Sequence, residues 1–535
     1  MFDVLIKNGL IVDGSGRSAY PADLAIRDGK VIKIAPNITD PAAEILDATG
    51  LVVAPGFVDC HTHSDSSIFE GSNCYNYLEQ GVTTEVAGQC GDSPAPYAEG
   101  AMLRDKAALS PEEFAYRTQL AASPATFMEA AKQASMGTNM AFYLGHNALR
   151  RKAMGFDPAA PSPSQMALMQ DYIRQAMEVG YLGYSTGLIY APSVYANTDE
   201  LIELAKAMAP YKGIYASHIR GEGNYVEEAV QEAIRIGEEA GVRVQISHLK
   251  VIGLHNEGKS INLLKMIDDA NARGVDVFAD QYPYTAGSAA LRTRIPPKYH
   301  VGGVAAFLER LKDPALRKKM EYSIFHEPHE YESCVYSAGF DGTLIASAAV
   351  TTELVGKTIG QLAKDSGKDP MDVFCDVLLA NNGVAQGIYF NQSTTDMMRI
   401  LAHPRVFGGS DSSNYPDQRC DPEQEGGRHL RGVTTMVRRL ELQRDFRLCT
   451  LEESVHRITY GPAQAMQLDG IGLLKEGWDA NVTIFDYERL HATATYAHPC
   501  RENQGIKYVL VNGKLAVKDG RVTGVRAGKL LTRSV

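Results

Sequence analysis

The sequence predicts an α/β protein in which a TIM-like (β/α)8 barrel carries a small β-sandwich and an inserted lid. Two observations lead to this fold. Short β-type runs alternate with amphipathic helical runs through the middle of the chain, and turn-rich β-type runs stand at both of its ends. Repeated βα alternation is typical of a barrel with helices outside its strands. Short strands without helices need partners to bury one face of a sheet.

The two ends of the chain are predicted to form one domain. Residues 1–55 contain DVLIKNGLIVDG, DLAIRDGKVIKIA and LVVAPGF, and residues 475–535 contain NVTIFDYE and IKYVLVNGKLAVKDGRVTG. Neither end can bury a sheet face alone, and both have the same pattern of short β-type runs separated by turns. We therefore expect them to pair into one small β-sandwich.

Residues 56–474 are predicted to form the barrel. Its expected strands are FVDCHTH, TTEVAG, AFYLGH, GYSTG, IYASH, RVQISH, VDVFADQYPY and VFGGSD, with helical runs between most of them. The alternation breaks at residues 290–350, after the seventh strand, where RIPPKYH precedes a charged helix. Because an insertion at this point would lie above the catalytic face of a barrel, residues 290–350 are expected to act as a lid.

Composition and charge favour a protein that acts on small molecules. The chain has 535 residues and a formal net charge of -11, which argues against binding to nucleic acid or an anionic membrane. No apolar stretch approaches the roughly 20 residues that span a bilayer, and the opening MFDVLIKNGLIVDGSG predicts a strand and not a signal peptide. The eight cysteines show no close pairing, so reduced thiols and a cytoplasmic location are expected. The oligomeric state is left open.

Four histidines stand at the predicted carboxyl ends of three barrel strands. His61 and His63 end the first strand, and side chains two residues apart on a strand point to the same face. His218 and His248 end the fifth and sixth strands. Because the carboxyl ends of barrel strands converge on the face where chemistry occurs, these imidazoles predict a metal site.

Asp411 and Cys90 are further candidates in this region. Asp411 ends the last strand, where a carboxylate can bind a metal and accept a proton from water, although an Asx turn or helix cap also suits it. Cys90 lies between Gly88 and Gly91, which would let the loop approach an ion closely. A lone cysteine is more often a small buried residue, so the residues by themselves leave its role open.

The chain resembles the amidohydrolase superfamily, and within it the D-aminoacylase (N-acyl-D-amino-acid deacylase) family. The resemblance runs nearly end to end, through NGLIVDG, PGFVDCHTHSD, GQCGDSPAP, LGHNALR, GYSTGLIYAP, SHIRGEG, QISHLK, DQYPYTAGS, GSD and VLVNGKLAVKDG. The HTH motif is shared across the superfamily, whereas the GxCG loop, STGLIY and SHLK together are more specific. The chain departs from the family pattern at Gln89, where asparagine is usual, at Ser412 and Ser413, where glycine is common, and at His429-Leu430-Arg431, where an HPR-like element is usual.

The resemblance implies a zinc-dependent hydrolase with two metal positions. One would hold a tightly bound Zn²⁺ through Cys90, His218 and His248. The other, often weaker, would be formed by His61, His63 and Asp411. Asp411 would act as general base and then general acid in hydrolysis of an N-acyl-D-amino acid. The preference for the D configuration rests on the resemblance alone.

The α-carboxylate of such a substrate needs a cation and hydrogen-bond donors. Lys250 lies two residues after His248, and Tyr190 and Tyr282 offer phenolic donors. The resemblance suggests substrate binding for Lys250 and Tyr190. His146, in LGHNALR, ends the third predicted strand and is expected to support the substrate site.

Three arginines are candidates for binding a second carboxylate. Arg292 and Arg294 precede the predicted lid helix, and Arg431 follows the last strand. Any of them would favour N-acyl-D-glutamate or N-acyl-D-aspartate, although each by itself is also compatible with an ordinary surface arginine.

Two other functions stay open at this point. A cyclic amidase of the same superfamily, such as a dihydropyrimidinase, hydantoinase or dihydroorotase, resembles this chain in fold and in its HxH motif. Those enzymes typically carry a bridging lysine on strand four, where this chain has GYSTGL. A non-catalytic scaffold should lack some of the six ligand residues, and this chain retains all of them.

Overall fold

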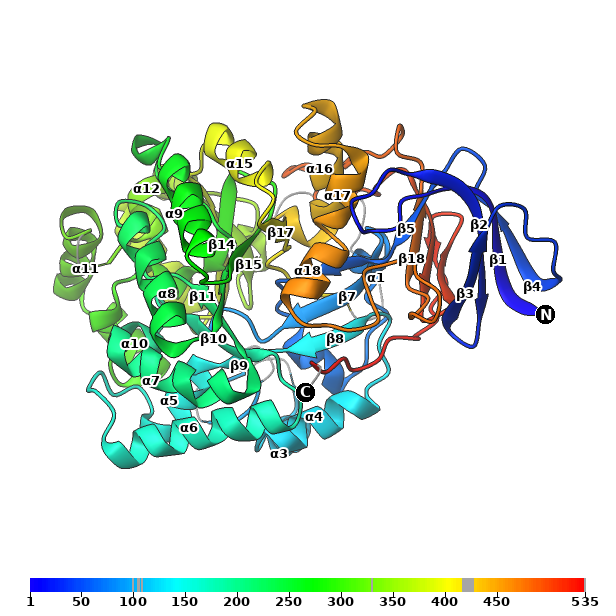
Figure 1. Ribbon diagram of the computed structural model, residues 1–535. Coiled ribbons are helices and arrows are strands. Elements are labelled where there is room, and N and C mark those ends of the chain that lie inside the picture. Colours follow the sequence, from blue (N-terminus) through cyan, green and yellow to red (C-terminus); the bar gives the residue numbers. More distant parts are fainter. Residues whose placement is uncertain (99–100, 103–105, 107–108, 329–330, 416–427, 534–535) are drawn as a thin grey trace.

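Two parallel sheets form the centre of the computed structural model, which describes residues 1–98, 101–102, 106, 109–328, 331–415 and 428–533 (Figure 1). One has the strand order β6-β7-β8 and the other β9-β10-β11-β12-β13-β17. Their bounds are β6 Phe57–Asp59, β7 Val82–Ala87, β8 Asn139–Phe142, β9 Leu144–Gly145, β10 Gly183–Gly187, β11 Ile214–His218, β12 Arg243–Ile246, β13 Val277–Gln281 and β17 Val406–Gly408. Each of the eight predicted strand runs overlaps one or two of them.

Backbone contacts join the two sheets into a barrel. Only Tyr143 separates β8 from β9, and the amide of Leu182, just before β10, donates to the carbonyl of Phe142 at 2.9 Å. At the opposite edges, the amide of Cys60, just after β6, donates to the carbonyl of Gly408 in β17 at 3.1 Å. The strands thus follow one another around the barrel in chain order, and the predicted (β/α)8 architecture is confirmed.

Amphipathic helices cover the outside of the barrel (Figure 1). Ser162 begins α6 (Pro163–Glu178) with a capping box that includes Gln165, and Gly241 ends α8 (Val226–Ala240) in the left-handed conformation. Because its apolar residues recur every three or four positions, α8 buries one face against the strands. Helices α7 (Thr198–Met208), α9 (Ser260–Ala272) and α16 (Arg431–Asp445) also belong to this layer.

The two ends of the chain meet in one nine-stranded sheet. Its order is β21-β20-β19-β18-β5-β1-β2-β3, with β4 paired to β1. The antiparallel pair of β5 and β18 joins the N-terminal strands, blue in Figure 1, to the C-terminal strands, red. The bounds are β1 Phe2–Ile11, β2 Tyr20–Arg27, β3 Lys30–Ala35, β4 Ala42–Asp47, β5 Val52–Pro55, β18 Val482–Phe485, β19 Ile506–Val511, β20 Lys514–Lys518 and β21 Arg521–Val522. The exact division into residues 1–55 plus 475–535 and 56–474 stays a prediction.

An antiparallel sheet with its own hydrophobic core is inserted between β13 and β17. Strand β16 (Ala385–Phe390) lies between β14 (Ala286–Ala290) and β15 (Thr343–Ala348). The core packs Phe307, Phe374 and other apolar residues from helices α10 Gly303–Leu311, α11 Pro314–His326, α12 Cys334–Ala338, α13 Ile359–Ser366 and α14 Pro370–Ala380. This unit contains the predicted segment 290–350 and continues beyond it, because the middle strand of the sheet comes last in the chain. Its action as a lid stays a prediction.

Two further observations concern the helices and the cysteines. None of the helices in the described parts of the chain has the length and apolar character needed to cross a membrane. Cys500 is disulfide-bonded, so the expectation that all the thiols are reduced is wrong for this residue. The cysteine spacing gave no sign of the bond, because a disulfide depends on proximity in the folded chain.

A buried carboxylate stabilises the terminal sheet. Asp23, in β2, accepts hydrogen bonds from the Lys7 ammonium at 2.5 Å and from the amides of Asn8 and Ile38 at 2.8 Å each. Burial by itself would raise the pKa of Asp23, but Lys7 and the two amides hold it below the ordinary value. The ionised carboxylate therefore ties together segments that are distant in the chain.

We expect Asp23→Asn to lower the free energy of unfolding by about 2 kcal/mol at pH 7, since a charged acceptor with three donors is lost. A lowered folded-state pKa contributes stability above the unfolded value of about 4, and this contribution is lost as the pH falls through the folded value. The difference in the free energy of unfolding between variant and wild type should thus shrink below pH 4. Denaturant unfolding at several pH values measures it, with the exposed Asp40→Asn as control. Equal effects of the two substitutions at pH 7 would contradict the prediction.

Candidate metal centre

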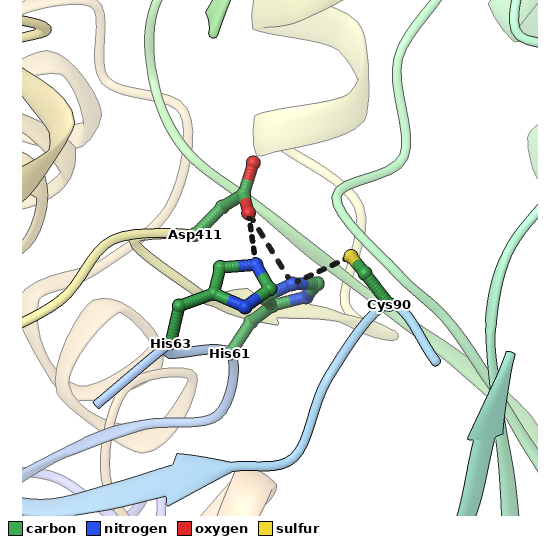
Figure 2. Close-up of side chains that lie close together, drawn as sticks. All are labelled: His61, His63, Cys90 and Asp411. Carbon is green, nitrogen blue, oxygen red and sulfur yellow. Dashed lines mark hydrogen bonds and ion pairs between the residues drawn. The ribbon is translucent and has the colours of Figure 1, made fainter. Parts of the chain in front are cut away.

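The six residues predicted to bind metal come together at the carboxyl ends of the barrel strands. They form two groups that share Cys90, and within each group the ligand atoms all lie within 4.8 Å of one another. The first group consists of His61, His63, Cys90 and Asp411, the four side chains drawn in Figure 2. The second consists of Cys90, His218 and His248.

The distances around the Cys90 sulfur fit the ligand shell of a metal ion. Its Sγ lies 3.4 Å from His61 Nε2, 3.4 Å from His248 Nε2 and 3.7 Å from His218 Nδ1. With metal–sulfur and metal–nitrogen bonds of about 2.3 and 2.1 Å, a tetrahedral ion would place these atoms about 3.6 Å apart. Burial raises the pKa of the Cys90 thiol well above its ordinary value, and a cation beside the sulfur would favour the thiolate. The residues present therefore fit zinc.

Three of these residues adopt an unusual backbone conformation. Cys90, His248 and Asp411 have φ values of 55°, 37° and 52°, in the left-handed region that residues other than glycine rarely occupy. Such conformations persist where the surrounding structure enforces them, and they are common at functional sites. Beside Cys90, a Cβ on Gly88 would lie 1.9 Å from the carbonyl oxygen of Tyr143, so only glycine fits there.

Asp411 belongs to the first group, faces its two histidines and is ionised. Its Oδ1 lies 2.9 Å from His63 Nε2 and 3.4 Å from His61 Nε2, and its Oδ2 accepts a hydrogen bond from Arg431 at 2.5 Å. Burial by itself would raise the pKa of Asp411, but Arg431 and the neighbouring imidazoles hold it well below the ordinary value. A carboxylate in this state can bind a cation or accept a proton.

Two buried carboxylates behind the histidines were missed by the sequence analysis. Asp280 Oδ1 lies 3.1 Å from His61 Nδ1, and the same atom accepts the backbone amide of His248 at 2.8 Å. Glu222 Oε1 lies 3.3 Å from His248 Nδ1 and 3.7 Å from His218 Nε2. Asp280 stands in the predicted strand VDVFADQYPY and Glu222 four residues after His218, so their place near the site was visible, but no motif marked their role.

The structure places Lys250, Tyr190 and Tyr282 around the same centre. The ring of Tyr190 is 5.0 Å from that of His218, between ring centroids. Tyr282 is buried, with the Lys250 ammonium 5.7 Å and the Arg431 guanidinium 5.3 Å from its ring centroid. The Lys250 ammonium is itself bound by the carboxylate of Glu222.

The three candidate arginines have different surroundings. Arg431 is paired with Asp411, and Arg292 donates to the carbonyl of Gly383 at 3.2 Å. Arg294 is only 1% exposed and donates to the Cys334 sulfur at 2.8 Å. Among the residues that the structure describes, no aspartate or glutamate forms an ion pair with Arg294, so this buried positive charge has no carboxylate counter-ion in that part of the chain.

His146 lies apart from the ligand groups. Its Nδ1 is 2.8 Å from Ser193 Oγ and its Nε2 is 3.2 Å from Glu200 Oε1, and the ring is fully buried. Both ring nitrogens are engaged by the protein, and the expected role of His146 at the substrate site stays a prediction. The residue braces the helix α5 (His146–Met154) against α7.

The departures from the family pattern lie close to the ligands. Gln89 is buried and donates to the carbonyl of Cys60 at 2.9 Å, which ties the Cys90 loop to the first strand. Ser413 donates to the carbonyl of His63 at 2.8 Å. His429 Nε2 lies 2.7 Å from the carbonyl oxygen of Ala286, beside the inserted sheet. These side chains support the loops around the site.

Comparisons with known proteins agree with this geometry. A sequence model described as the amidohydrolase family matches residues 44–320 and 329–517. The D-aminoacylase of Alcaligenes xylosoxydans xylosoxydans is 34% identical over 535 residues, covering 100% of this chain and 98% of the relative. The N-acyl-D-aspartate deacylase and the N-acyl-D-glutamate deacylase of the same organism are each 31% identical, over 99% of this chain and 95% and 96% of their own lengths.

Solved structures show the same relationship. A D-aminoacylase studied for its binuclear metal center is 29% identical with a TM-score of 0.83 over 100% of both chains. The N-acyl-D-glutamate deacylase of Bordetella bronchiseptica, complexed with zinc and a phosphonate inhibitor, is 31% identical with a TM-score of 0.80 over 99% of both chains. An L-hydantoinase of Arthrobacter aurescens, at 17% identity and a TM-score of 0.57, shares the fold alone. With a family match over most of its length and relatives of more than 30% identity along all of it, this chain belongs to the amidohydrolase family.

Proposed function

We propose that this protein is a metal-dependent hydrolase of N-acyl-D-amino acids, with zinc as the metal. The observation that carries the proposal is the Cys90 sulfur 3.4–3.7 Å from three imidazole nitrogens, with the ionised Asp411 on the same side of the barrel. The full-length relatives named D-aminoacylase and N-acyl-D-amino-acid deacylases support the substrate class. When bound, zinc supplies Lewis acidity, which polarises a carbonyl group and makes water acidic enough to react near neutral pH.

In this proposal Asp411 moves the proton. Its Oδ1, which faces His61 and His63, accepts a proton from the attacking water as the C–O bond forms, and Arg431 holds Oδ2 in place. Asp411 then donates that proton to the amide nitrogen as the C–N bond breaks. An amide leaves poorly without protonation, so one group has to act as base and then as acid. The products are a carboxylate and a free D-amino acid.

The surroundings of the cations favour an acidic substrate side chain. Lys250 and Arg431 already face carboxylates of the chain, whereas Arg294 is buried without one in the described residues. Burial raises the pKa of Tyr190 well above its ordinary value, and the charge of Arg294 opposes this shift, which supports a place for Arg294 in the substrate site. Because a buried charge without a counter-ion is costly, a carboxylate on the substrate side chain would stabilise this pocket. We therefore propose N-acyl-D-glutamate or N-acyl-D-aspartate as the preferred substrate.

The cyclic-amidase alternative has less support. The fourth barrel strand, β10, reads GYSTG and contains no lysine that could bridge two metals. The hydantoinase similarity is at the level of fold alone. Faster turnover of a dihydropyrimidine or hydantoin than of any N-acyl-D-amino acid would reverse this choice.

The metal and Asp411 can be tested together. We expect the chelator-treated protein to be inactive on N-acetyl-D-amino acids and to regain activity with zinc. Asp411→Asn should lower kcat by about 10²–10⁴-fold, since proton transfer is lost, while zinc stays bound through Cys90, His218 and His248. Amine release and metal content are the readouts, with Asp268→Asn, an exposed carboxylate on α9, as the control. An Asp411→Asn variant with wild-type kcat would sink the assignment.

The side-chain preference can be tested at Arg294. We expect Arg294→Met to lower kcat/KM for N-acetyl-D-glutamate by about 10–100-fold, the value of one charge-assisted hydrogen bond, and to spare N-acetyl-D-leucine. Arg273→Met serves as the control, because it makes the same substitution at an exposed arginine that follows α9. The panel also contains the L enantiomers, which test the D preference. An equal loss of kcat/KM on both D substrates would contradict the proposed preference for an acidic side chain.

A further inference from the structure

Glu222 is a buried carboxylate that the proposed reaction does not use. It lies in the loop between β11 and α8, four residues after His218, and is 7% exposed. Its Oε1 contacts the Lys250 ammonium, His248 Nδ1 at 3.3 Å and His218 Nε2 at 3.7 Å. A single oxygen atom thus faces both histidines of the second ligand group, on the side away from the Cys90 sulfur.

The position of each ring proton follows from the side that faces Cys90. His248 turns Nε2 toward the Cys90 sulfur, and a nitrogen that binds a metal cannot carry a proton. In the metal-bound state the proton of a neutral His248 is therefore on Nδ1, which then needs an acceptor. The Lys250 ammonium, 2.7 Å away, cannot serve because it has donors only. Glu222 is the acceptor in reach.

His218 has the opposite orientation and the same requirement. It turns Nδ1 toward Cys90, so its ring proton in the metal-bound state is on Nε2. This atom is buried and has no hydrogen-bond partner among the described residues, but it lies 3.7 Å from Glu222 Oε1. A small rotation of either side chain would bring it within hydrogen-bond distance of the same carboxylate.

Lys250 makes this arrangement electrostatically possible. It is buried, it binds Glu222, and it donates to the carbonyl oxygen of His248 at 2.8 Å. A buried carboxylate is costly without a counter-ion, and Lys250 supplies one while holding Glu222 in place.

We propose that Glu222 is a positioning residue that fixes the tautomers of both His218 and His248 and thereby sets the metal affinity of the Cys90 group. A carboxylate that accepts the far ring proton orients the imidazole and makes its other nitrogen a better ligand. One carboxylate does this for two histidines here, with opposite ring nitrogens. The inference rests on the metal site of the proposed function but not on its substrate.

Metal affinity of the apo-protein tests the role of Glu222. Competition with a chromophoric chelator measures the Kd for zinc in wild type, Glu222→Gln, Glu222→Ala and the control Glu228→Gln, an exposed residue in the first turn of α8. We expect Glu222→Ala to raise the Kd by about 10–100-fold, Glu222→Gln by less because its amide oxygen still accepts, and Glu228→Gln not at all. Wild-type affinity in a folded Glu222→Ala variant would overturn the proposal. If Glu222→Ala does not fold, the proposal is overturned when Glu222→Gln binds zinc with wild-type affinity and the tautomer measurement below also contradicts it.

A spectroscopic measurement on the wild type is independent of any variant. Nitrogen NMR of the histidine-labelled, zinc-loaded protein reports which ring nitrogen carries the proton. We expect a proton on Nδ1 of His248 and on Nε2 of His218, and the reverse tautomer in either would refute the proposal. Neither experiment contains a substrate. Glu222→Ala can therefore change the metal affinity even if the protein has no deacylase activity. The failure of one proposal is thus distinguishable from the failure of the other.

Discussion

The site depends on one constraint, which is the convergence of several metal-binding side chains on a single buried sulfur. The ligand atoms of each group lie within 4.8 Å of one another, and all of these residues except the half-buried His63 are buried. Four imidazoles, a thiol and a carboxylate would not stay so close on a flexible loop. Parallel strands of a closed barrel hold them, because their carboxyl ends meet on one face. The left-handed conformations of Cys90, His248 and Asp411 are tolerated because this frame enforces them.

Charge balance is the second condition for such a centre. Two of the carboxylates near the ligands have a cationic partner from another part of the chain: Arg431 for Asp411 and Lys250 for Glu222. These pairs keep the carboxylates ionised despite burial, which is the state needed to accept protons from histidine or water. Arg294 does not follow this pattern in the described residues. In the proposed function, this cation is the feature through which the site distinguishes one substrate side chain from another.

The terminal sheet and the inserted unit, which lie outside the barrel, differ in how they relate to the site. The terminal sheet joins the two ends through the pairing of β5 and β18, and β6, with the first histidines after it, follows β5 directly. The inserted unit between β13 and β17 has its own core and carries Arg294. The candidate metal ligands therefore come from the barrel and the proposed side-chain contact from the insertion. Such a division lets the substrate pocket vary without changes to the metal site.

The sequence alone determined the barrel, the pairing of the two ends and the six candidate ligands. Local patterns carry this information, because strand and helix periodicity and the position of a histidine at the end of a strand are visible in short windows. The Cys90 role came from resemblance, since a lone cysteine has no local signal. Only the tertiary structure showed that Glu222 and Asp280 stand behind the histidines, that His146 is engaged by Ser193 and Glu200, and that the three arginines differ. Ion pairs and hydrogen bonds join residues that are distant in the chain, and their partners are set by packing and not by spacing.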